Sequence, residues 1–423
     1  MKKYVAAIAA LGLASTLLTG CGSGTSQEPK ADGYDLTVWV YSDMVQNEQG
    51  KLMDQWVDEF KTEHPEVKSI TLVPKNDAEL LSSLMAGVGL PDVFSASARD
   101  AKNYKRVIDL LDLSEVFADQ EFSGGFYPEA LDAVTVDDGV WAIPFISYIP
   151  VIFRNLTVLK EAGIDPAEGI PTYDRFLEQM AQVKKAGFDA THSWTEGGYF
   201  APGAVMGSDA QNITVGVSDG KTTIKPEQLQ RTFSTLSALE AQANSSLVYD
   251  ADATMEAFKT NKLAYLLAGP WQEPGIQQSG VDYDFVLVPP YEKDGWTGGL
   301  QGWDFFYGVK SDDSARNELI AAYLKKLGSF ESEKAWSINV GRSTLRQDVM
   351  NDPDVLAAGG MLELSSKGLT MGMRQMEFMH SSVFWPSAIV DPASRLGKGA
   401  TSPEQASQQF VDAINDLYAE AGE

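Results

Sequence analysis

Residues that carry covalent or metal chemistry are scarce in this chain of 423 residues. It has one cysteine, Cys21, and three histidines, His64, His192 and His380, which lie far apart in the sequence. A single cysteine excludes a disulfide framework and a cysteine-based zinc cluster. The chain lacks an HExxH helix and the GxxxxGK[S/T], GxGxxG and GxSxG motifs, which argues against zinc hydrolases, nucleotide or dinucleotide binding and serine hydrolases. We therefore predict no catalytic residue, no metal and no cofactor.

Basic residues are also few. The chain has 33 Lys and Arg against 59 Asp and Glu, a formal net charge of −26. Such a surface repels nucleic acid and anionic head groups, so we predict no nucleic-acid partner and favour a neutral or cationic ligand. The length exceeds what one hydrophobic core usually supports, which predicts two domains or lobes.

Long apolar runs are absent except for residues 4–18, which follow Lys2 and Lys3. The run is shorter than the roughly 20 residues of a membrane-spanning helix. A basic start, an apolar centre and small residues before a cut are typical of a secretory signal. The Leu-Thr-Gly-Cys sequence that ends at Cys21 resembles a lipobox, in which the thiol receives a diacylglycerol before cleavage. Two acyl chains, such as palmitate, form a stable membrane anchor.

These features predict three segments at the start of the chain. Residues 1–20 are expected to be a lipoprotein signal peptide, and residues 21–33 a lipidated Cys21 followed by a small, polar, flexible linker. The mature protein is then expected on the extracellular face of the cell membrane, held there by lipid, in a Gram-positive bacterium.

The rest of the chain alternates between strand-like and helix-like patterns. Apolar, β-rich runs are followed by amphipathic stretches, such as the one that places Leu52, Trp56 and Phe60 on one face, and we expect Asp77 to cap the next helix. Strand, helix, strand, helix, strand over the first part of the body predicts an α/β protein with a parallel sheet. Strands are expected at 36–41, 69–74, 92–94, 140–144, 150–153, 263–267, 285–288 and 305–309, and helices at 156–162, 172–185, 226–243, 252–260, 316–327 and 403–421.

Aromatic residues are plentiful, and several tryptophans lie in Gly- or Pro-rich contexts rather than on helix faces. Trp271 follows Gly-Pro, Trp303 follows a Gly-rich stretch and Trp385 precedes a proline. A sugar ring has an apolar C–H face that stacks on a flat aromatic ring, and an edge of hydroxyls that bind polar side chains. Trp56, on an apolar helix face, is expected in the core. Polar residues of the kind that bind hydroxyls accompany the loop tryptophans, namely Glu196, Gln272, Gln301, Asp304 and Arg342.

Several short stretches of the body resemble the motifs of one family and occur in that family's order. Residues 87–94 match a G-x-x-P-D-V turn, 139–144 match G-x-x-Y/W-x-x-P, and 255–271 match F-x-x-G-x-x-A-M-x-x-x-G-x-W. Further matches are 59–65, 288–290, 298–299 and 338–342, although Ser343-Thr344 stands where the family often has proline. The chain thus resembles the extracellular solute-binding proteins of ABC transporters, sugar-binding type (family 1), related to maltose-binding protein.

The resemblance implies an α/β, two-lobed fold of the type II periplasmic-binding-protein class, with three interlobe crossings and a ligand cleft between the lobes. It also implies that hinge closure traps an oligosaccharide and that the closed form delivers it to a membrane permease, without catalysis. We expect a monomer and a neutral sugar of two or more units. The expected boundaries are 34–146 and 297–341 for lobe 1, 147–296 and 342–423 for lobe 2, and 144–150, 290–297 and 340–343 for the crossings.

The candidate ligand-binding residues come from three sources. Trp271 and Trp385 fall on aromatic positions of the family that often stack on sugar, other residues follow the first strands, and the rest lie in the hinge or in aromatic loops. The full set is Tyr41, Asp43, Asn76, Asp77, Tyr148, Trp194, Glu196, Trp271, Gln301, Trp303, Asp304, Arg342 and Trp385.

Two other functions stay open from the sequence. One is a receptor for a peptide or a cationic solute, which the acidic surface would permit. The other is a surface glycoside hydrolase, since a pair of catalytic carboxylates follows no spacing rule. The sequence does not identify the sugar, its linkage or its length.

Overall fold

The computed structural model describes residues 33–97, 101–137, 139–213, 216–243, 251–297, 300–371, 373–374 and 385–421. The predicted signal peptide, Cys21 and nearly all of the predicted linker lie outside the described residues. Among the described residues, no helix combines the length and the apolar character needed to cross a membrane.

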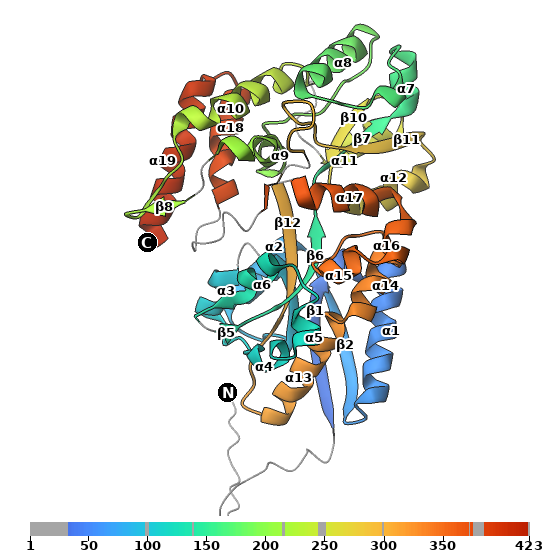
Figure 1. The fold of residues 1–423 in the computed structure, drawn as a ribbon, viewed down its shortest axis with the longest axis vertical. Coiled ribbons are helices and arrows are strands. Elements are labelled where there is room, and N and C mark those ends of the chain that lie inside the picture. The colour runs from blue at the N-terminus through green and yellow to red at the C-terminus, as the bar shows by residue number, and fades with distance from the viewer. Residues whose placement is uncertain are drawn as a thin grey trace, which may run out of the picture.

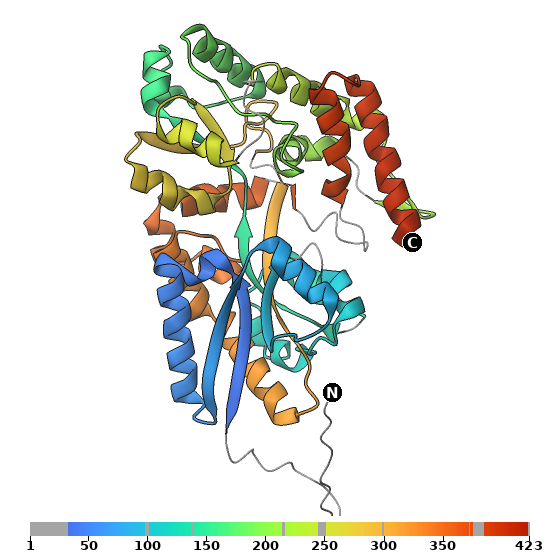
Figure 2. The same ribbon diagram turned by 180° about the vertical axis from the view of Figure 1, so that it is seen from behind.

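The chain forms two α/β lobes stacked along the long axis of the molecule (Figures 1 and 2). Lobe 1 contains a mixed sheet in which β1 pairs in parallel with β2 and β3, while β12 pairs antiparallel with β3 and β6. The predicted parallel arrangement is confirmed for the first three strands. The elements of lobe 1 are β1 (Tyr34–Tyr41), the 3-10 helix η1 (Ser42–Val45), α1 (Asn47–Glu63), β2 (Val67–Lys75), α2 (Asp77–Ala86), β3 (Val93–Ser97), α3 (Ala101–Val107), α4 (Ser114–Phe117), α5 (Gln120–Ser123), α6 (Pro128–Val134), β4 (Thr135–Val136), β5 (Gly139–Val140), β6 (Ile143–Tyr148), β12 (Leu300–Gly308), α13 (Ser314–Leu327), α14 (Phe330–Val340), α15 (Gln347–Met350) and α16 (Pro353–Ala358).

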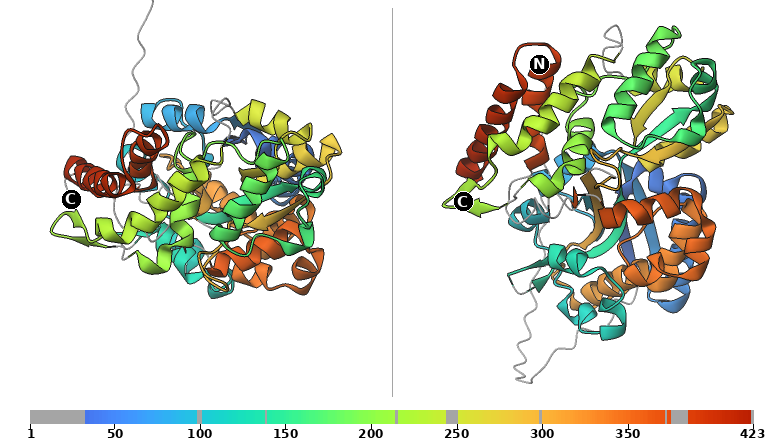
Figure 3. Two further views of the ribbon diagram at one scale, coloured as in Figure 1. Left: turned by 90° about the horizontal axis from the view of Figure 1, so that it is seen from above. Right: turned by 45° about the horizontal axis from the view of Figure 1, so that its top comes forward.

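Lobe 2 contains a smaller sheet of order β10-β7-β11, and both strand pairs in it are antiparallel. Helices α10, α18 and α19 lie side by side at one edge of this lobe (Figure 3). The elements of lobe 2 are β7 (Val151–Asn155), α7 (Leu156–Glu161), η3 (Pro166–Glu168), α8 (Tyr173–Lys185), α9 (Phe200–Ser208), η4 (Ala210–Asn212), β8 (Val217–Ser218), β9 (Lys221–Thr222), α10 (Pro226–Glu240), α11 (Ala251–Lys259), β10 (Tyr265–Ala268), η5 (Pro270–Gln272), α12 (Glu273–Ser279), β11 (Tyr283–Leu287), α17 (Gly360–Met371), β13 (Met373–Arg374, which pairs with the start of β12), η7 (Trp385–Ile389), α18 (Val390–Gly397) and α19 (Pro403–Ala421).

Each lobe has its own apolar core. Trp56, Phe60 and Trp336 are buried in lobe 1, where the rings of Trp56 and Trp336 lie 6.1 Å apart. Phe176 and Trp194 are buried in lobe 2. The expected core position of Trp56 is therefore confirmed.

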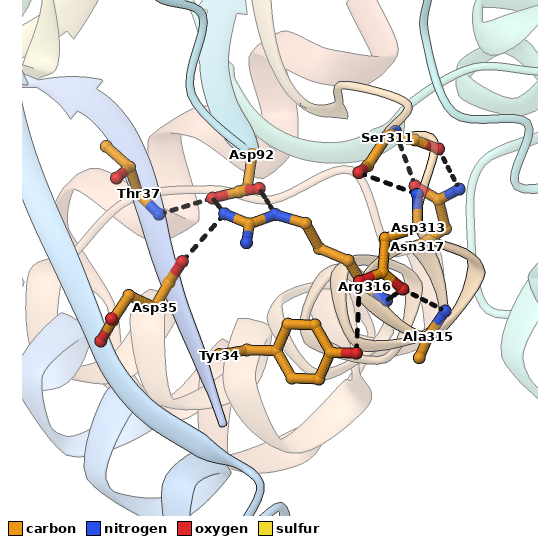
Figure 4. Close-up of polar contacts among 9 residues, drawn as sticks. All are labelled: Tyr34, Asp35, Thr37, Asp92, Ser311, Asp313, Ala315, Arg316 and Asn317. Atoms are coloured by element: carbon orange, nitrogen blue, oxygen red, sulfur yellow. Dashed lines mark hydrogen bonds and ion pairs between the residues drawn. The ribbon is translucent and has the colours of Figure 1, made fainter. Parts of the chain in front are cut away.

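A carboxylate at the residue before β3 connects several elements of lobe 1 (Figure 4). Asp92 Oδ2 accepts hydrogen bonds from the backbone N–H of Thr37 in β1 and from Arg316 Nη2 in α13, both at 2.8 Å. Arg316 Nη2 also donates to the Asp35 carbonyl at 2.8 Å. Asp92 therefore joins two strands and a helix and lies outside the cavity described below.

Two predictions of local structure are wrong. The cap of α2 is Asn76, not Asp77, because Asn76 Oδ1 accepts from the Glu79 N–H at 2.9 Å while Glu79 Oε2 accepts from the Asn76 N–H at 3.2 Å. This reciprocal pair is a capping box, which needs the acidic residue three positions after the cap.

Lobe 1 also extends past residue 341, where the sequence predicts its end. Leu345 is buried in the lobe 1 core, and its N–H donates to the Phe145 carbonyl at 3.0 Å. Helices α15 and α16 pack on α14, so residues 342–358 belong to lobe 1. The third crossing is therefore at Gly359 and Gly360, where φ is 64° and 59°, backbone values that favour glycine.

Candidate ligand-binding site

A cavity of about 680 Å³ lies between the two lobes and is lined by residues of both. This volume is within the range of about 300–1,000 Å³ that is typical of small-molecule sites. Its position follows from the topology, because β1, β2 and β3 are parallel and their carboxyl ends point toward lobe 2 (Figure 2). Tyr41, Lys75 and Ser97, the last residues of these strands, all line the cavity. Ligand contacts at the carboxyl edge of parallel strands are common in α/β proteins.

The lobe 1 wall carries the charge. Among the described lining residues, the charged side chains are Asp43, Lys75, Asp304 and Arg342, and all four belong to lobe 1. Arg342 is largely buried and donates to Asp43 Oδ2 at 2.8 Å. Lys75 Nζ lies 4.3 Å from the centroid of the Trp39 ring and donates to Ser83 Oγ at 3.3 Å. With two carboxylates and two cations, this wall is close to electrically neutral.

The facing wall is aromatic. The ring centroid of Trp271 is 5.2 Å from that of Tyr148 and 6.0 Å from that of Phe200, both in edge-to-face geometry. Trp271 is 39% exposed, which is unusual for so large an apolar side chain and leaves part of the indole available to a ligand. Together these rings form an apolar corner of the cavity, in which Tyr148 of lobe 1 meets Trp271 and Phe200 of lobe 2.

Two glycines allow these rings to lie close to the backbone. A Cβ atom on Gly302 would lie 1.9 Å from the Tyr148 ring, since the two residues are paired across β12 and β6. A Cβ atom on Gly269 would lie 2.2 Å from the Trp271 ring. Glycine in a strand often marks such a close approach.

Lobe 2 also contributes two buried polar side chains, His192 and Thr254, which are 4% and 3% exposed. Burial lowers the pKa of His192 from 6.5 to about 4, because a charged imidazole would lose its hydration. His192 is therefore neutral at physiological pH. The lobe 2 wall then carries no charge among its described lining residues.

The family of the chain follows from its sequence. The model of the bacterial extracellular solute-binding proteins matches residues 55–362, which is most of the chain. The chain belongs to this family. It is the solute-binding component of an ABC transporter, and the two-lobed fold with a cavity between the lobes is the structure that the resemblance implied.

Sequence relatives and structural neighbours of this solute-binding protein differ in their ligands. The sn-glycerol-3-phosphate-binding periplasmic protein UgpB of Escherichia coli O1:K1 is 21% identical over 364 residues, covering 80% of this chain and 78% of UgpB. The GacH receptor of Streptomyces glaucescens, solved unliganded and with acarbose, has a TM-score of 0.74 at 17% identity and covers 92% of this chain and 100% of its own. The cyclic α-maltosyl-1,6-maltose binding protein of Arthrobacter globiformis has a TM-score of 0.74 at 16% identity, with the same coverage. At such identities, the structural likeness establishes the fold alone.

More than half of the predicted ligand residues line the cavity of this solute-binding protein. They are Tyr41, Asp43, Asn76, Tyr148, Trp271, Asp304 and Arg342. Their contact with a ligand stays a prediction. For three further candidates the described structure includes no side chain: Asp77 begins α2, Gln301 lies in β12 and Trp385 begins η7.

The other three candidates are placed away from the cavity. Trp194 is fully buried in the lobe 2 core, where its indole N–H donates to Thr191 Oγ1 at 3.0 Å. Trp303 is 3% exposed in the lobe 1 core. Glu196 accepts from Ser394 Oγ at 3.4 Å and is not a lining residue. Other residues cover the rings of Trp194 and Trp303 in this structure, and a ligand contact of either ring stays a prediction.

Several lining residues were missed by the sequence analysis. His192 and Thr254 sit in contexts without a motif, and only the fold brings them to the cavity. Tyr199 and Phe200 follow Gly197-Gly198, the same glycine-then-aromatic pattern that singled out Trp271 and Trp303, so a signal for them was present.

Proposed function

We propose that the chain binds a neutral oligosaccharide of two or more units in the interlobe cavity and delivers it to an ABC permease. One observation carries this proposal: an aromatic corner on one wall faces a set of hydrogen-bonding side chains on the other, across one cavity. Sugars present these two surfaces, a C–H face for stacking and an edge of hydroxyls.

Each wall has a defined role in this proposal. The exposed part of the Trp271 indole stacks on the apolar face of a sugar ring. Asp304 accepts hydrogen bonds from hydroxyls, Asn76 both donates and accepts, and Arg342 donates. Since Asp43 already neutralises Arg342, the ligand need not supply a countercharge.

Binding is coupled to the movement of the lobes. A ligand that contacts both walls stabilises the closed form over the open form by the contacts that only the closed form completes. The chain crosses between the lobes next to Ile149, between β11 and β12, and at Gly359-Gly360. We propose that these segments form the hinge and that the closed form docks on the permease.

Two of the similar solved structures support an oligosaccharide as the ligand. One was solved in complex with acarbose, and the other is a cyclic α-maltosyl-1,6-maltose binding protein. The sequence relatives favour a second candidate, sn-glycerol-3-phosphate. One observation agrees with the second candidate: Lys75 lines the cavity, and within the described chain it has no carboxylate within 4.0 Å. The balance of two cations and two carboxylates favours the neutral ligand.

We further propose that the protein is a monomer without enzymatic activity, held on the extracellular face of a Gram-positive membrane by acyl chains on Cys21. The lipobox-like sequence supports this anchor. Labelled palmitate should be incorporated into the full chain and not into Cys21→Ala, which should leave the membrane fraction. Equal membrane retention of both would overturn the anchor.

Calorimetric titration of the full chain, solubilised in mild detergent, tests the ligand class. A panel of neutral oligosaccharides, sn-glycerol-3-phosphate and cationic peptides should give binding only among the neutral sugars, with little change in affinity between low and high salt. Binding of the phosphate ester alone, with strong salt dependence, would establish the second candidate instead. Steady release of shorter sugars during the titration would reveal a glycoside hydrolase.

A further inference from the structure

Two polar side chains on the lobe 2 side of the cavity have no role in the stacking or in the lobe 1 hydrogen bonds proposed above. Thr254, from the first part of α11, and His192, from the segment after α8, both line the cavity and are both more than nine-tenths buried. Apolar residues, including Leu266 and Met255, line the cavity with them.

Among the residues that the structure describes, the Thr254 hydroxyl has no hydrogen-bond partner. By contrast, Thr260, the residue that follows α11, donates from Oγ1 to the Glu256 carbonyl at 2.7 Å, a side-chain-to-backbone bond that threonine commonly makes. A buried hydroxyl without a partner costs about 1–3 kcal/mol, so folded proteins rarely retain one. A hydroxyl of this kind at the surface of a ligand cavity can recover the lost hydrogen bond when a ligand binds.

The surroundings determine which ligand group fits. A neutral imidazole offers one donor and one acceptor, and the threonine hydroxyl can do both. Among the described lining residues, lobe 2 provides no Lys or Arg that could neutralise an anion. Moving a phosphate or a carboxylate into this place would remove its hydration without a countercharge, whereas a hydroxyl would be fully satisfied.

We propose that Thr254 and His192 form a subsite that binds a hydroxyl group of a neutral sugar unit at one end of the ligand and rejects an anionic group there. This inference rests on the proposed function and adds a specificity element to it. Sites built to hydrogen-bond a hydroxyl discriminate strongly against ligands that lack it, because their own buried polar groups are then left unpaired.

The first test compares three variants of the full chain by calorimetry with a neutral oligosaccharide that binds the wild type. Thr254→Val keeps the shape and removes the hydroxyl, and it should weaken binding about fivefold to tenfold. Thr254→Ser should bind within twofold of the wild type. Thr232→Val is the control, because Thr232 is also fully buried in lobe 2 but does not line the cavity. It should bind like the wild type.

The second test changes the ligand, so it does not depend on how a variant folds. The ligands are analogues that each lack one hydroxyl of a terminal sugar unit. At least one analogue should bind the wild type at least fivefold more weakly than the parent sugar does. Thr254→Val should bind this same analogue and the parent sugar with equal affinity. A phosphate at that hydroxyl should abolish binding to the wild type.

The outcomes separate the subsite from the proposed function. If no neutral oligosaccharide binds the wild type, the proposed function fails. If a sugar binds, but Thr254→Val binds equally well and every deoxy analogue loses the same affinity in both proteins, the subsite is overturned while the proposed function stands. Should Thr254→Val not fold, undiminished binding of every deoxy and phosphorylated analogue to the wild type would overturn the subsite.

Discussion

The two walls of the cavity differ in chemistry. The lobe 1 wall is polar and contains charged residues that are partly paired with one another, such as Asp43 and Arg342. The lobe 2 wall consists of aromatic, small and neutral polar residues around Trp271. Apolar stacking supplies affinity in proportion to buried area, whereas hydrogen bonds to fixed partners mainly supply specificity. For the proposed sugar ligand we therefore expect lobe 2 to provide most of the affinity and lobe 1 to select the pattern of hydroxyls.

The largest expected effect tests the neutrality of the lobe 2 wall and concerns folding stability. His192 has its pKa lowered from 6.5 to about 4 by burial, so between these pH values the unfolded chain binds a proton that the folded chain does not. The free energy of unfolding therefore falls as the pH drops through this window, by about 2 kcal/mol from this group between pH 7 and pH 4.5. Urea denaturation at both pH values should show that His192→Gln removes this part of the loss.

The matched control for His192 is His64→Gln, at a partly exposed position next to Glu66. This variant accounts for the effect of replacing a histidine as such. If wild type and His192→Gln lose the same stability on acidification, His192 is accessible to protons in the folded protein and the lobe 2 wall is not neutral at low pH.

The next effect concerns affinity from the aromatic wall. Trp271→Ala should weaken oligosaccharide binding at least tenfold, or about 1.4 kcal/mol, measured by calorimetry. Because the side chain is 39% exposed, the melting temperature should change little. Ile338→Ala, at a residue 41% exposed on lobe 1 and outside the cavity, should leave affinity unchanged. If Trp271→Ala folds and binds the sugar as tightly as the wild type does, lobe 1 and not lobe 2 provides most of the binding free energy.

The contrast between Trp271 and Trp194 shows what the sequence could predict. Both lie in glycine-containing segments, and both were candidates for stacking. Trp194 is instead buried by residues distant in sequence, including Phe176, whose ring is 6.0 Å away. The burial of the Trp194 ring depends on tertiary packing, which a local sequence pattern does not predict.

Other parts were predictable because their cause is local or topological. The alternation of strands and helices predicted the lobe 1 sheet, and the parallel strands placed Tyr41 and Asn76 at its edge. The resemblance implies a crossing at 340–343, but the burial of Leu345 and the packing of α15 and α16 on α14 depend on tertiary contacts and keep the following residues in lobe 1.

A smaller effect is expected from the charged wall. Arg342→Gln should weaken binding about fivefold, since it removes a donor and leaves Asp43, which is 43% exposed, to be hydrated. Combining it with Asp43→Asn should cost less than the sum of the single changes, because the two residues act as a pair. Lys325→Gln, which breaks a surface ion pair with Asp119 outside the cavity, is the control and should not alter binding. Additive losses in the double variant would show that each residue contacts the ligand independently.

The smallest expected effect tests the place where the walls meet, at Tyr148. In Gly302→Ala, the new Cβ would lie 1.9 Å from the Tyr148 ring, so the ring must move into the cavity or along the strand. This displacement should disturb the edge-to-face contact with Trp271 and weaken binding about threefold by calorimetry.

Gly275→Ala is the control, because its Cβ would make only an ordinary contact of 3.6 Å with Lys259. In a Tyr148→Ala background the alanine at position 302 should have no further effect, since the ring that it displaces is gone. If Gly302→Ala alone binds like the wild type, the position of the Tyr148 ring does not matter to the ligand, and the aromatic wall reduces to Trp271 and Phe200 on lobe 2.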